Sequence, residues 1–291
     1  MYIGEIAALT TACCWAIAAR MFQMLGAYFT PLALNLWKGV LAAFVLALVT
    51  IVNPLEVSLD TIAISWLLLS GIIGIGLGDT FFFRALNTIG DSQSILVAET
   101  LAPIFTALLA MIWINEWLTW QQWIGIAIVI LSVDVIIKLQ KRNERQLFSI
   151  TGYVFAALAA VCQAVGAVIS RDILTTTGID AANASLYRLL GGLAAIVLLM
   201  LFMRRRFTPL QPLGKPGVKL LLWATLLGTF AALYLQMIAF ANTKAAIVQT
   251  LFATSVVLSL IVAVFVGDKV NKKTFIWSLL ALVGVSVLIL S

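Results

Sequence analysis

Charged residues are scarce in this sequence. Asp, Glu, Lys and Arg make up 10% of its 291 residues, whereas a soluble domain carries about 25%. Hydrophobic types make up 63%, and the mean hydropathy is +1.11. This composition argues against a soluble enzyme and excludes a disordered chain. It predicts a protein that crosses a membrane several times.

Histidine is absent, and there are only three cysteines. Without histidine, serine–histidine triads, histidine proton relays and histidine-bound zinc are unavailable. Three cysteines cannot form the disulfide framework of a small secreted domain. Cys13, Cys14 and Cys162 all fall within apolar runs. We therefore expect no metal site and no cofactor, and any proton coupling would have to use carboxylates.

In place of charge, the sequence has ten apolar runs, each long enough for a transmembrane helix of about 20 residues. The runs are apolar on all sides and lack the alternation of a barrel strand, so we expect helices. Too little chain remains between them for a separate catalytic or sensor domain. The predicted fold class is an all-α integral membrane protein with ten transmembrane helices. The expected spans are roughly 3–23, 31–52, 61–83, 93–114, 120–138, 149–170, 181–203, 217–240, 244–266 and 273–290.

Lysine and arginine are distributed unequally among the connections. If the N-terminus lies outside, the outer connections hold only Arg171 and Lys244 of the 18 basic residues. By the positive-inside rule, this bias predicts that both termini lie outside. The net charge of +6 is then mostly a topology signal, and we expect no nucleic-acid partner. The fourteen basic residues on the cytoplasmic side would be Arg20, Arg84, Lys138, Lys141, Arg142, Arg145, Arg204, Arg205, Arg206, Lys215, Lys219, Lys269, Lys272 and Lys273.

The second half of the chain restates the first at an offset near 150. Residues 14–16 (Cys-Trp-Ala) match 162–164 (Cys-Gln-Ala), and residues 36–38 (Leu-Trp-Lys) match 186–188 (Leu-Tyr-Arg). Each repeat holds five helices, which is an odd number, so the second copy is inverted in the membrane. Inverted repeats are typical of secondary transporters, with the binding site near the midplane between the halves. We expect two repeats, at 1–140 and 149–290.

Three motifs of the first half resemble a known repeat. The run 76–86 (GLGDTFFFRAL) is followed by 101–107 (LAPIFTA), then by 116–119 (EWLT), and Gly125 comes nine residues after Glu116. This pattern resembles the EamA-type repeat of the drug/metabolite transporter superfamily. The resemblance implies a ten-helix secondary transporter with a central cavity. It also implies export or exchange of amino acids, metabolites, drugs or nucleotide derivatives, mostly without ATP.

The second repeat departs from that pattern at two positions. Asp268 stands where the family's loop usually has Glu. Ser255 stands at the position matching Pro103, so we expect the helix 244–266 to lack a proline-type distortion there. Family members also more often have cytoplasmic termini, opposite to the orientation that the basic residues of this chain predict.

Several ionisable residues fall inside the expected spans. An ionised side chain there costs about 2.5–3.5 kcal/mol on insertion scales, so such groups usually pair or function. Lys38, Asp79 and Glu99 share a depth band and are predicted to form one inner cluster. One interpretation is a buried ion pair that fixes helix register. The other makes Asp79 or Glu99 a proton acceptor, coupled to substrate binding at Lys38.

Arg188 is the strongest single candidate for binding substrate. The repeat equivalents of Glu99 and Asp79 fall near Leu251 and Ala231, so Arg188 lacks the acidic neighbours expected around Lys38. Its planar guanidinium suits a carboxylate or a phosphate. The alternatives are that Arg188 extends outward to the headgroups or pairs with Glu5.

Uncharged groups inside the spans supply further candidates. Gln163, Tyr234 and Gln249, together with Trp15, are predicted to orient a polar ligand. Alternatively, such groups bridge helices, each for about 0.6 kcal/mol. Small residues point to packing: the Gly-x-x-x-Gly of residues 74–78 and the pair at 191–192 favour close helix contact, with hinge motion as the alternative.

The sequence therefore predicts a secondary active transporter in a bacterial cytoplasmic membrane. It would move small polar metabolites, such as amino acids, by export or exchange through alternating access. The alternatives are a multidrug or cation exporter, a non-transporting membrane subunit, a passive channel and a lipid-modifying enzyme. The expected partners are a small-molecule substrate and the lipid bilayer. Proton coupling and oligomerisation are left open.

Overall fold

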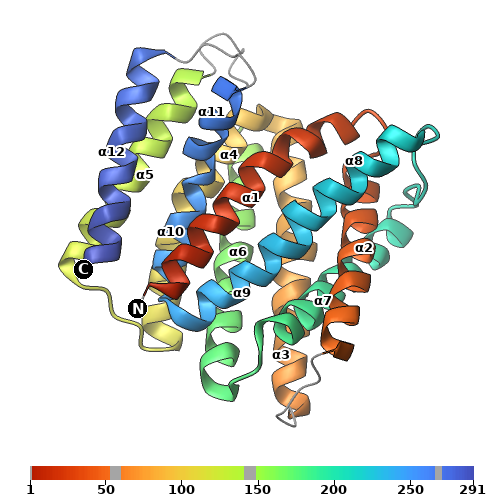
Figure 1. Cartoon of the computed structure of the whole chain (residues 1–291), viewed down its shortest axis with the longest axis horizontal. Coiled ribbons are helices and arrows are strands. Elements are labelled where there is room, and N and C mark those ends of the chain that lie inside the picture. Colours follow the sequence, from red (N-terminus) through yellow and green to blue (C-terminus); the bar gives the residue numbers. More distant parts are fainter. Residues whose placement is uncertain (1, 53–59, 141–148, 266–270) are drawn as a thin grey trace.

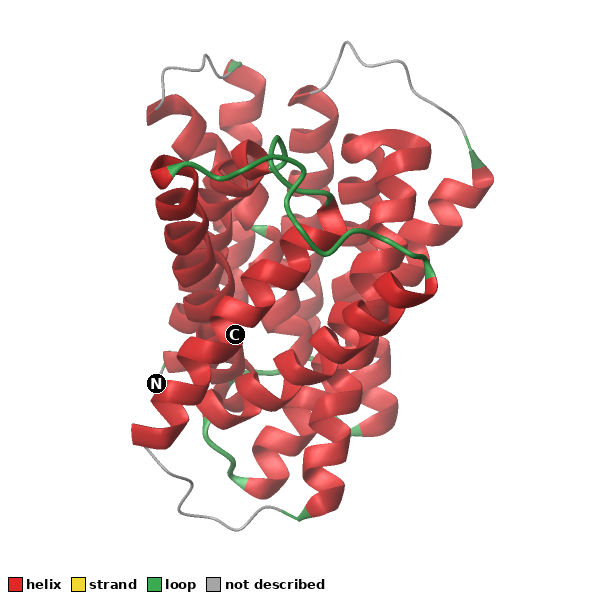
Figure 2. Cartoon of the chain, turned by 90° about the vertical axis from the view of Figure 1, so that its right-hand side faces the viewer, coloured by secondary structure: helices red, strands yellow, loops and turns green. Residues whose placement is uncertain are grey.

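A computed structural model describes residues 2–52, 60–140, 149–265 and 271–291 of the chain. These residues form a bundle of helices joined by short connections (Figures 1 and 2). Ten helical stretches are long and apolar enough to cross a membrane, which confirms the predicted fold class. The elements are α1 (Ile3–Leu25), α2 (Pro31–Val52), α3 (Thr61–Gly71), η1 (Ile72–Leu77), α4 (Gly78–Trp113), α5 (Trp120–Gln140), α6 (Ile150–Thr177), α7 (Ala181–Phe202), α8 (Lys215–Thr225), η2 (Leu226–Ala231), α9 (Ala232–Asn242), α10 (Ala245–Ala253), α11 (Ser255–Phe265) and α12 (Lys272–Leu290).

The third and fourth spans meet within α4. Its backbone leaves helical geometry at Gly90, where φ is 80° and ψ is 168°. Only glycine adopts this conformation readily, because it has no Cβ. The chain reverses there, so the third span runs over Thr61–Gly90 and the fourth over Gln93–Trp113.

Two spans contain a π-helical segment in their middle. η1 interrupts the third span and η2 interrupts the eighth, each over six residues. The two segments begin 154 residues apart, so they are repeat equivalents. A π-turn adds a residue to the helical repeat and is frequent at functional sites. The sequence predicts these spans as the apolar runs 61–83 and 217–240, and an apolar run carries no signal for a π-turn.

The ninth span has a local break in its hydrogen-bond pattern at Thr254, where the backbone stays in the right-handed helical region (φ −65°, ψ −11°). α10 ends at Ala253 and α11 begins at Ser255. At the break, the N–H and the hydroxyl of Thr254 both bond to the carbonyl of Leu251, three residues back. Side-chain hydroxyls of this kind compete for helix carbonyls and disturb the regular bonding pattern. Asp268, the other departure from the family pattern, lies outside the described residues.

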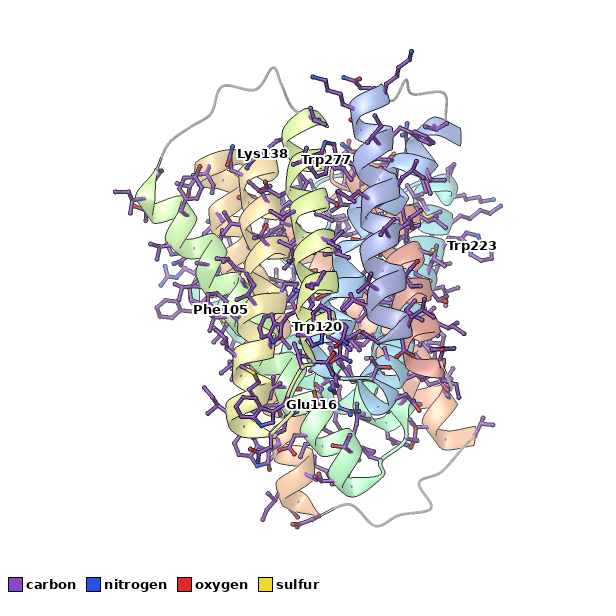
Figure 3. The ribbon with its side chains drawn as sticks, turned by 90° about the vertical axis from the view of Figure 1, so that its left-hand side faces the viewer. Phe105, Glu116, Trp120, Lys138, Trp223 and Trp277 are labelled. Carbon is purple, nitrogen blue, oxygen red and sulfur yellow. The ribbon has the colours of Figure 1, made fainter. Side chains whose placement is uncertain are left out.

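Helices of the two repeats are interleaved. α4 packs against α6, α3 and α2 pack against α7, and α1 packs against α9, while α5 pairs with α12. Large apolar side chains cover the outer surface: Phe202 is 89% exposed and Ile112 is 81% exposed. In Figure 3, Trp223 points away from the bundle. Such a surface suits a lipid environment. The domain boundaries expected at 1–140 and 149–290 stay a prediction.

Glycines bring α3 and α7 into backbone contact. A Cβ on Gly71 would overlap the carbonyl of Arg188, and a Cβ on Gly191 would overlap the carbonyl of Leu68. Small residues at such crossings let helix backbones approach closely. The packing interpretation of the pair at 191–192 therefore agrees with the structure. Gly71 adds to the same crossing, which fixes the helix that carries Arg188.

Replacing Gly71 with alanine should destabilise the protein. Because the added methyl group meets backbone, which cannot rotate away, the helices must separate, and overpacking of this kind costs about 1–3 kcal/mol. We expect a lower melting temperature in detergent. Gly214→Ala is the control, since its Cβ would lie 3.6 Å from Pro216, at ordinary contact distance. Equal melting temperatures for the two variants would contradict the packing role.

Candidate functional site

A cavity of about 140 Å³ lies between the two repeats. The first repeat contributes walls from α1, α2, η1 and α4, and the second contributes walls from α6, α7, η2 and α9. Both π-helical segments therefore reach the cavity. Its polar and aromatic lining consists of Trp15, Asn35, Lys38, Asp79, Gln163, Arg188, Thr229 and Gln236.

Arg188 is the most deeply buried charge in this lining, with 2% of its surface exposed. Its Nη1 donates to the hydroxyl of Ser170 at 2.6 Å and to the carbonyl of Gly166 at 3.1 Å. Its Nε has no hydrogen-bond partner among the described residues. Buried polar atoms are nearly always paired, so an unpaired one calls for an explanation. The alternatives of outward extension and of pairing with Glu5 do not fit this placement.

The guanidinium fits here because two neighbouring helices carry glycine beside it. A Cβ on Gly74 would lie 3.2 Å from the Nη2 of Arg188, and a Cβ on Gly166 would lie 3.4 Å from it. Both glycines belong to elements that pack around α7. The sequence therefore provides room for this side chain at the helix crossing.

Lys38 and Asp79 lie on another part of the same cavity. The Nδ2 of Asn35 donates to the Oδ2 of Asp79 at 2.7 Å, and the charges of Lys38 and Asp79 attract one another. Within the described part of the chain, no ion pair shorter than 4.0 Å joins them. The Nζ of Lys38 also lies 5.2 Å from the ring centroid of Phe22, a cation–π contact.

Five of the eight predicted site residues come together in the cavity: Trp15, Lys38, Asp79, Gln163 and Arg188. Three do not line it, namely Glu99, Tyr234 and Gln249. Glu99 is half-buried on the fourth span and forms no hydrogen bond or ion pair with the residues that the structure describes. The predicted inner cluster is thus reduced to Lys38 and Asp79.

Three further polar residues were not singled out from the sequence: Asn35, Thr229 and Gln236 line the cavity as well. The position of Asn35 in the cavity could have been predicted from the sequence, because Asn35 lies three residues before Lys38 and hence on the same helix face. Thr229 is notable because its buried hydroxyl has no hydrogen-bond partner in the described part of the chain. Two residues of the lining, Arg188 and Thr229, therefore each have a buried polar atom without a partner in the described part of the chain.

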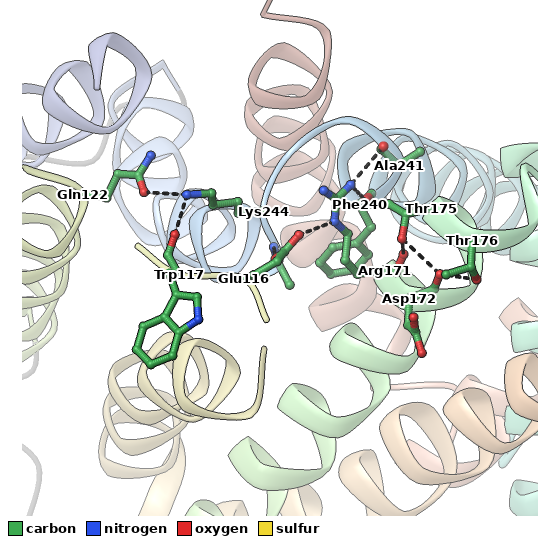
Figure 4. A network of polar contacts seen from close by, with 11 residues as sticks. Glu116, Trp117, Gln122, Arg171, Asp172, Thr175, Thr176, Phe240, Ala241 and Lys244 are labelled. Atoms are coloured by element: carbon green, nitrogen blue, oxygen red, sulfur yellow. Dashed lines mark hydrogen bonds and ion pairs between the residues drawn. The ribbon is translucent and has the colours of Figure 1, made fainter. Parts of the chain in front are cut away.

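A second polar group joins the repeats at one end of the bundle (Figure 4). The Nε of Arg171 donates to the Oε1 of Glu116 at 2.6 Å, and its Nη1 donates to the carbonyls of Phe240 and Ala241 at 2.6 and 2.9 Å. The Oε2 of Glu116 accepts the N–H of Ala245 at 3.0 Å. One ion pair thus connects the fourth, sixth, eighth and ninth spans.

Lys244 extends this group toward α5. Its Nζ donates to the carbonyl of Trp117 at 2.6 Å and to the Oε1 of Gln122 at 3.2 Å (Figure 4). A Cβ on Gly4 would overlap the side chain of Thr243, so the N-terminus lies at the same end. Lys138 lies at the opposite end (Figure 3). We call the contacts of Glu116, Trp117, Gln122, Arg171 and Lys244 the terminal network.

The terminal network was not predicted, although the sequence held a signal for it. Arg171 and Lys244 are the two basic residues that the charge count leaves on the outer connections. Both residues belong to the terminal network. Their contacts there explain why basic residues occur on connections that otherwise lack them.

The comparisons with known proteins agree with this architecture. The EamA-like transporter family matches the chain twice, over residues 2–138 and 150–290. One solved structure, described only as a crystal structure of a protein, has a TM-score of 0.81 and 19% sequence identity, covering 98% of this chain and 97% of that one. This likeness shows a shared fold. No curated protein matches the chain. Since the family matches span both five-helix halves, the chain belongs to the EamA-like transporter family of the drug/metabolite transporter superfamily.

Proposed function

We propose that this protein is a secondary active transporter that moves small polar metabolites, amino acids or related compounds, across the cytoplasmic membrane by export or exchange. The observation that carries the proposal is the cavity between the repeats, whose lining includes Arg188 and Thr229, each with a buried polar atom that has no hydrogen-bond partner among the described residues. Transport is favoured over catalysis, because the lining offers groups that bind and orient but no nucleophile with an activating base.

The size of the cavity favours small solutes over drugs. Pockets for drug-sized ligands measure about 300–1,000 Å³, whereas this one measures about 140 Å³. Its charge also disfavours a cation exporter, because Arg188 and Lys38 place two positive charges on the lining against the single carboxylate of Asp79. We assign substrate contacts to Arg188, Lys38, Gln163 and Trp15.

Alternating access would exchange the shapes of the two repeats around this cavity. We propose that the terminal network holds one end closed, since it ties spans of both repeats together. The positive-inside rule puts that end and both termini outside the cell. Substrate would then reach the cavity from the opposite, cytoplasmic end.

Proton coupling, if the transporter uses it, is best assigned to Asp79. This carboxylate lines the cavity together with Lys38, so its protonation would alter the field at the substrate site. Glu99 lies away from the lining and is the weaker candidate. Asp79→Asn should then remove the effect of an imposed pH gradient on uptake.

Counterflow in proteoliposomes tests the proposed function. Vesicles loaded with an unlabelled solute take up the labelled solute transiently against its gradient only if a carrier exchanges the two. The panel should hold monocarboxylates, dicarboxylates, zwitterionic amino acids and quaternary ammonium compounds. Saturable counterflow with any of the first three supports the proposal. Counterflow with the cations alone would favour a drug exporter, and flux without saturation would favour a channel.

A further inference from the structure

We propose that the cavity selects small organic monoanions and that Asp79 sets this charge preference by neutralising Lys38. The inference rests on the proposed function, because it requires the cavity to be the substrate site. It narrows that function from polar metabolites in general to carboxylates that carry a net charge of −1. Asp79 thereby becomes a residue that determines specificity without bonding to the substrate.

Two lining residues, Arg188 and Thr229, each have a buried side-chain atom that lacks a hydrogen-bond partner among the described residues. The Nε–H of Arg188 can only donate, and the hydroxyl of Thr229 can donate as well. A carboxylate supplies two acceptor oxygens, and guanidinium–carboxylate contacts are among the stronger hydrogen bonds of proteins. A carboxylate bound beside Arg188 would supply the negative charge that the second repeat does not provide.

The equivalent cations of the two repeats have different neighbours. Lys38 is the eighth residue of α2 and Arg188 is the eighth residue of α7. Asp79 is the second residue after η1, and the second residue after η2 is Leu233. Asn35, the fifth residue of α2, bonds to the side chain of Asp79.

The same contact recurs in the second repeat with an uncharged partner. Ser185, the fifth residue of α7, bonds to the backbone carbonyl of Leu233 at 3.2 Å. The hydrogen bond between the two helices is therefore present in both repeats, but in the second repeat its acceptor is a backbone carbonyl and not a carboxylate. The first repeat supplies a counter-charge for its cation, and the second leaves the charge of Arg188 to be matched by a ligand.

The charges of the lining sum to +1, from Lys38, Arg188 and Asp79. A monoanion brings this sum to zero. A dianion or a zwitterion leaves one charge uncompensated in a largely apolar cavity, where unpaired charges are costly. The apolar part of the lining includes Leu189 and Leu193, which suits the hydrocarbon portion of a carboxylic acid.

Variants that change the sum of charges test the inference. Asp79→Asn raises the sum to +2 and should shift the preference toward dianions. Lys38→Gln lowers it to zero and should shift the preference toward zwitterions. The double variant returns the sum to +1 and should recover the preference for monoanions. We expect each single substitution to change the relevant ratio of dissociation constants at least about tenfold, because the penalty of an unpaired buried charge exceeds that of a lost neutral hydrogen bond.

The measurement is equilibrium binding to the full-length purified protein by calorimetry, with matched probes: propionate against malonate, benzoate against phthalate, and alanine as the zwitterion. Asp134→Asn is the control, because its carboxylate pairs with Lys138 on the surface of α5 and its loss leaves the cavity unchanged. Elution as a single species in size-exclusion chromatography checks that each variant is folded.

The outcomes separate this inference from the proposed function. A parent protein that binds monoanions, with preferences that shift as described and return in the double variant, supports both. Unchanged ratios in Asp79→Asn and Lys38→Gln would overturn the charge rule and leave the transporter assignment standing. Preference of the parent for alanine or for the dianions would also overturn it. If no probe binds and no counterflow occurs, both the charge rule and the transporter assignment are wrong.

Discussion

Replacing Arg188 with glutamine is expected to weaken substrate binding by at least about 100-fold, equivalent to about 2.7 kcal/mol. Glutamine keeps a donor but loses the charge and the planar fork that match a carboxylate. Arg188 as a whole residue is only 2% exposed, so water screens its charge little. Removing one partner of a buried charged contact usually costs about 2–5 kcal/mol, and the expected loss lies within this range.

Titration calorimetry with the substrate found by counterflow measures this effect. Arg188→Lys should fall between the parent and Arg188→Gln, because it keeps the charge without the fork. Two threonine variants supply a matched comparison. Thr229→Val should weaken binding, whereas Thr225→Val, which removes an unpaired buried hydroxyl away from the cavity lining, should leave it unchanged. Full binding by Arg188→Gln would remove Arg188 from the substrate site.

Replacing Glu116 with glutamine should cost about 3 kcal/mol of stability, as breaking a buried ion pair does. The side chains of Glu116 and Arg171 are only 14% and 15% exposed, and both bind backbone groups of the second repeat. Loss of the carboxylate leaves the guanidinium partly buried without its counter-ion. The end of the bundle held by the terminal network should therefore open more readily.

Melting temperatures of Glu116→Gln, Arg171→Gln and the double variant measure the coupling between the two side chains. We expect the double variant to lose less stability than the sum of the two single losses, because the pair acts as a unit. Asp134→Asn is the control: its partner Lys138 is 61% exposed, and such surface pairs contribute only about 0–1 kcal/mol. Strictly additive losses would show that Glu116 and Arg171 act independently.

Hydropathy predicted the ten spans because the bilayer demands long apolar helices. It misjudged their ends where polar residues extend a helix beyond the apolar run. The sixth span was expected to end near residue 170 but continues to Thr177. In this extension Arg171 bonds to other helices and the hydroxyls of Thr175 and Thr176 bond to carbonyls of their own helix, contacts that a hydropathy profile does not register.

The charged residues of the cavity lining could be predicted from the cost of placing charge in a membrane, which singled out Lys38, Asp79 and Arg188. Which face of each helix turns inward could not be predicted. One extra residue in a π-turn rotates everything after it by about 100° relative to an unbroken α-helix. η2 lies just before Tyr234 and turns that side chain away from the cavity. Leu233, the preceding residue, lines the cavity instead. Thr229 was missed because it lies within η2 itself.

Cysteine accessibility shows whether one cavity between the repeats opens to each side of the membrane in turn. Gln163 is exposed and lines the cavity, so Gln163→Cys reports on it once Cys13, Cys14 and Cys162 are replaced by alanine. A membrane-impermeant thiol reagent is added from either side of vesicles of known orientation. Alternating access through this cavity should give labelling from both sides and protection by a bound monocarboxylate. Labelling from one side only, or equal labelling with and without the ligand, would contradict it.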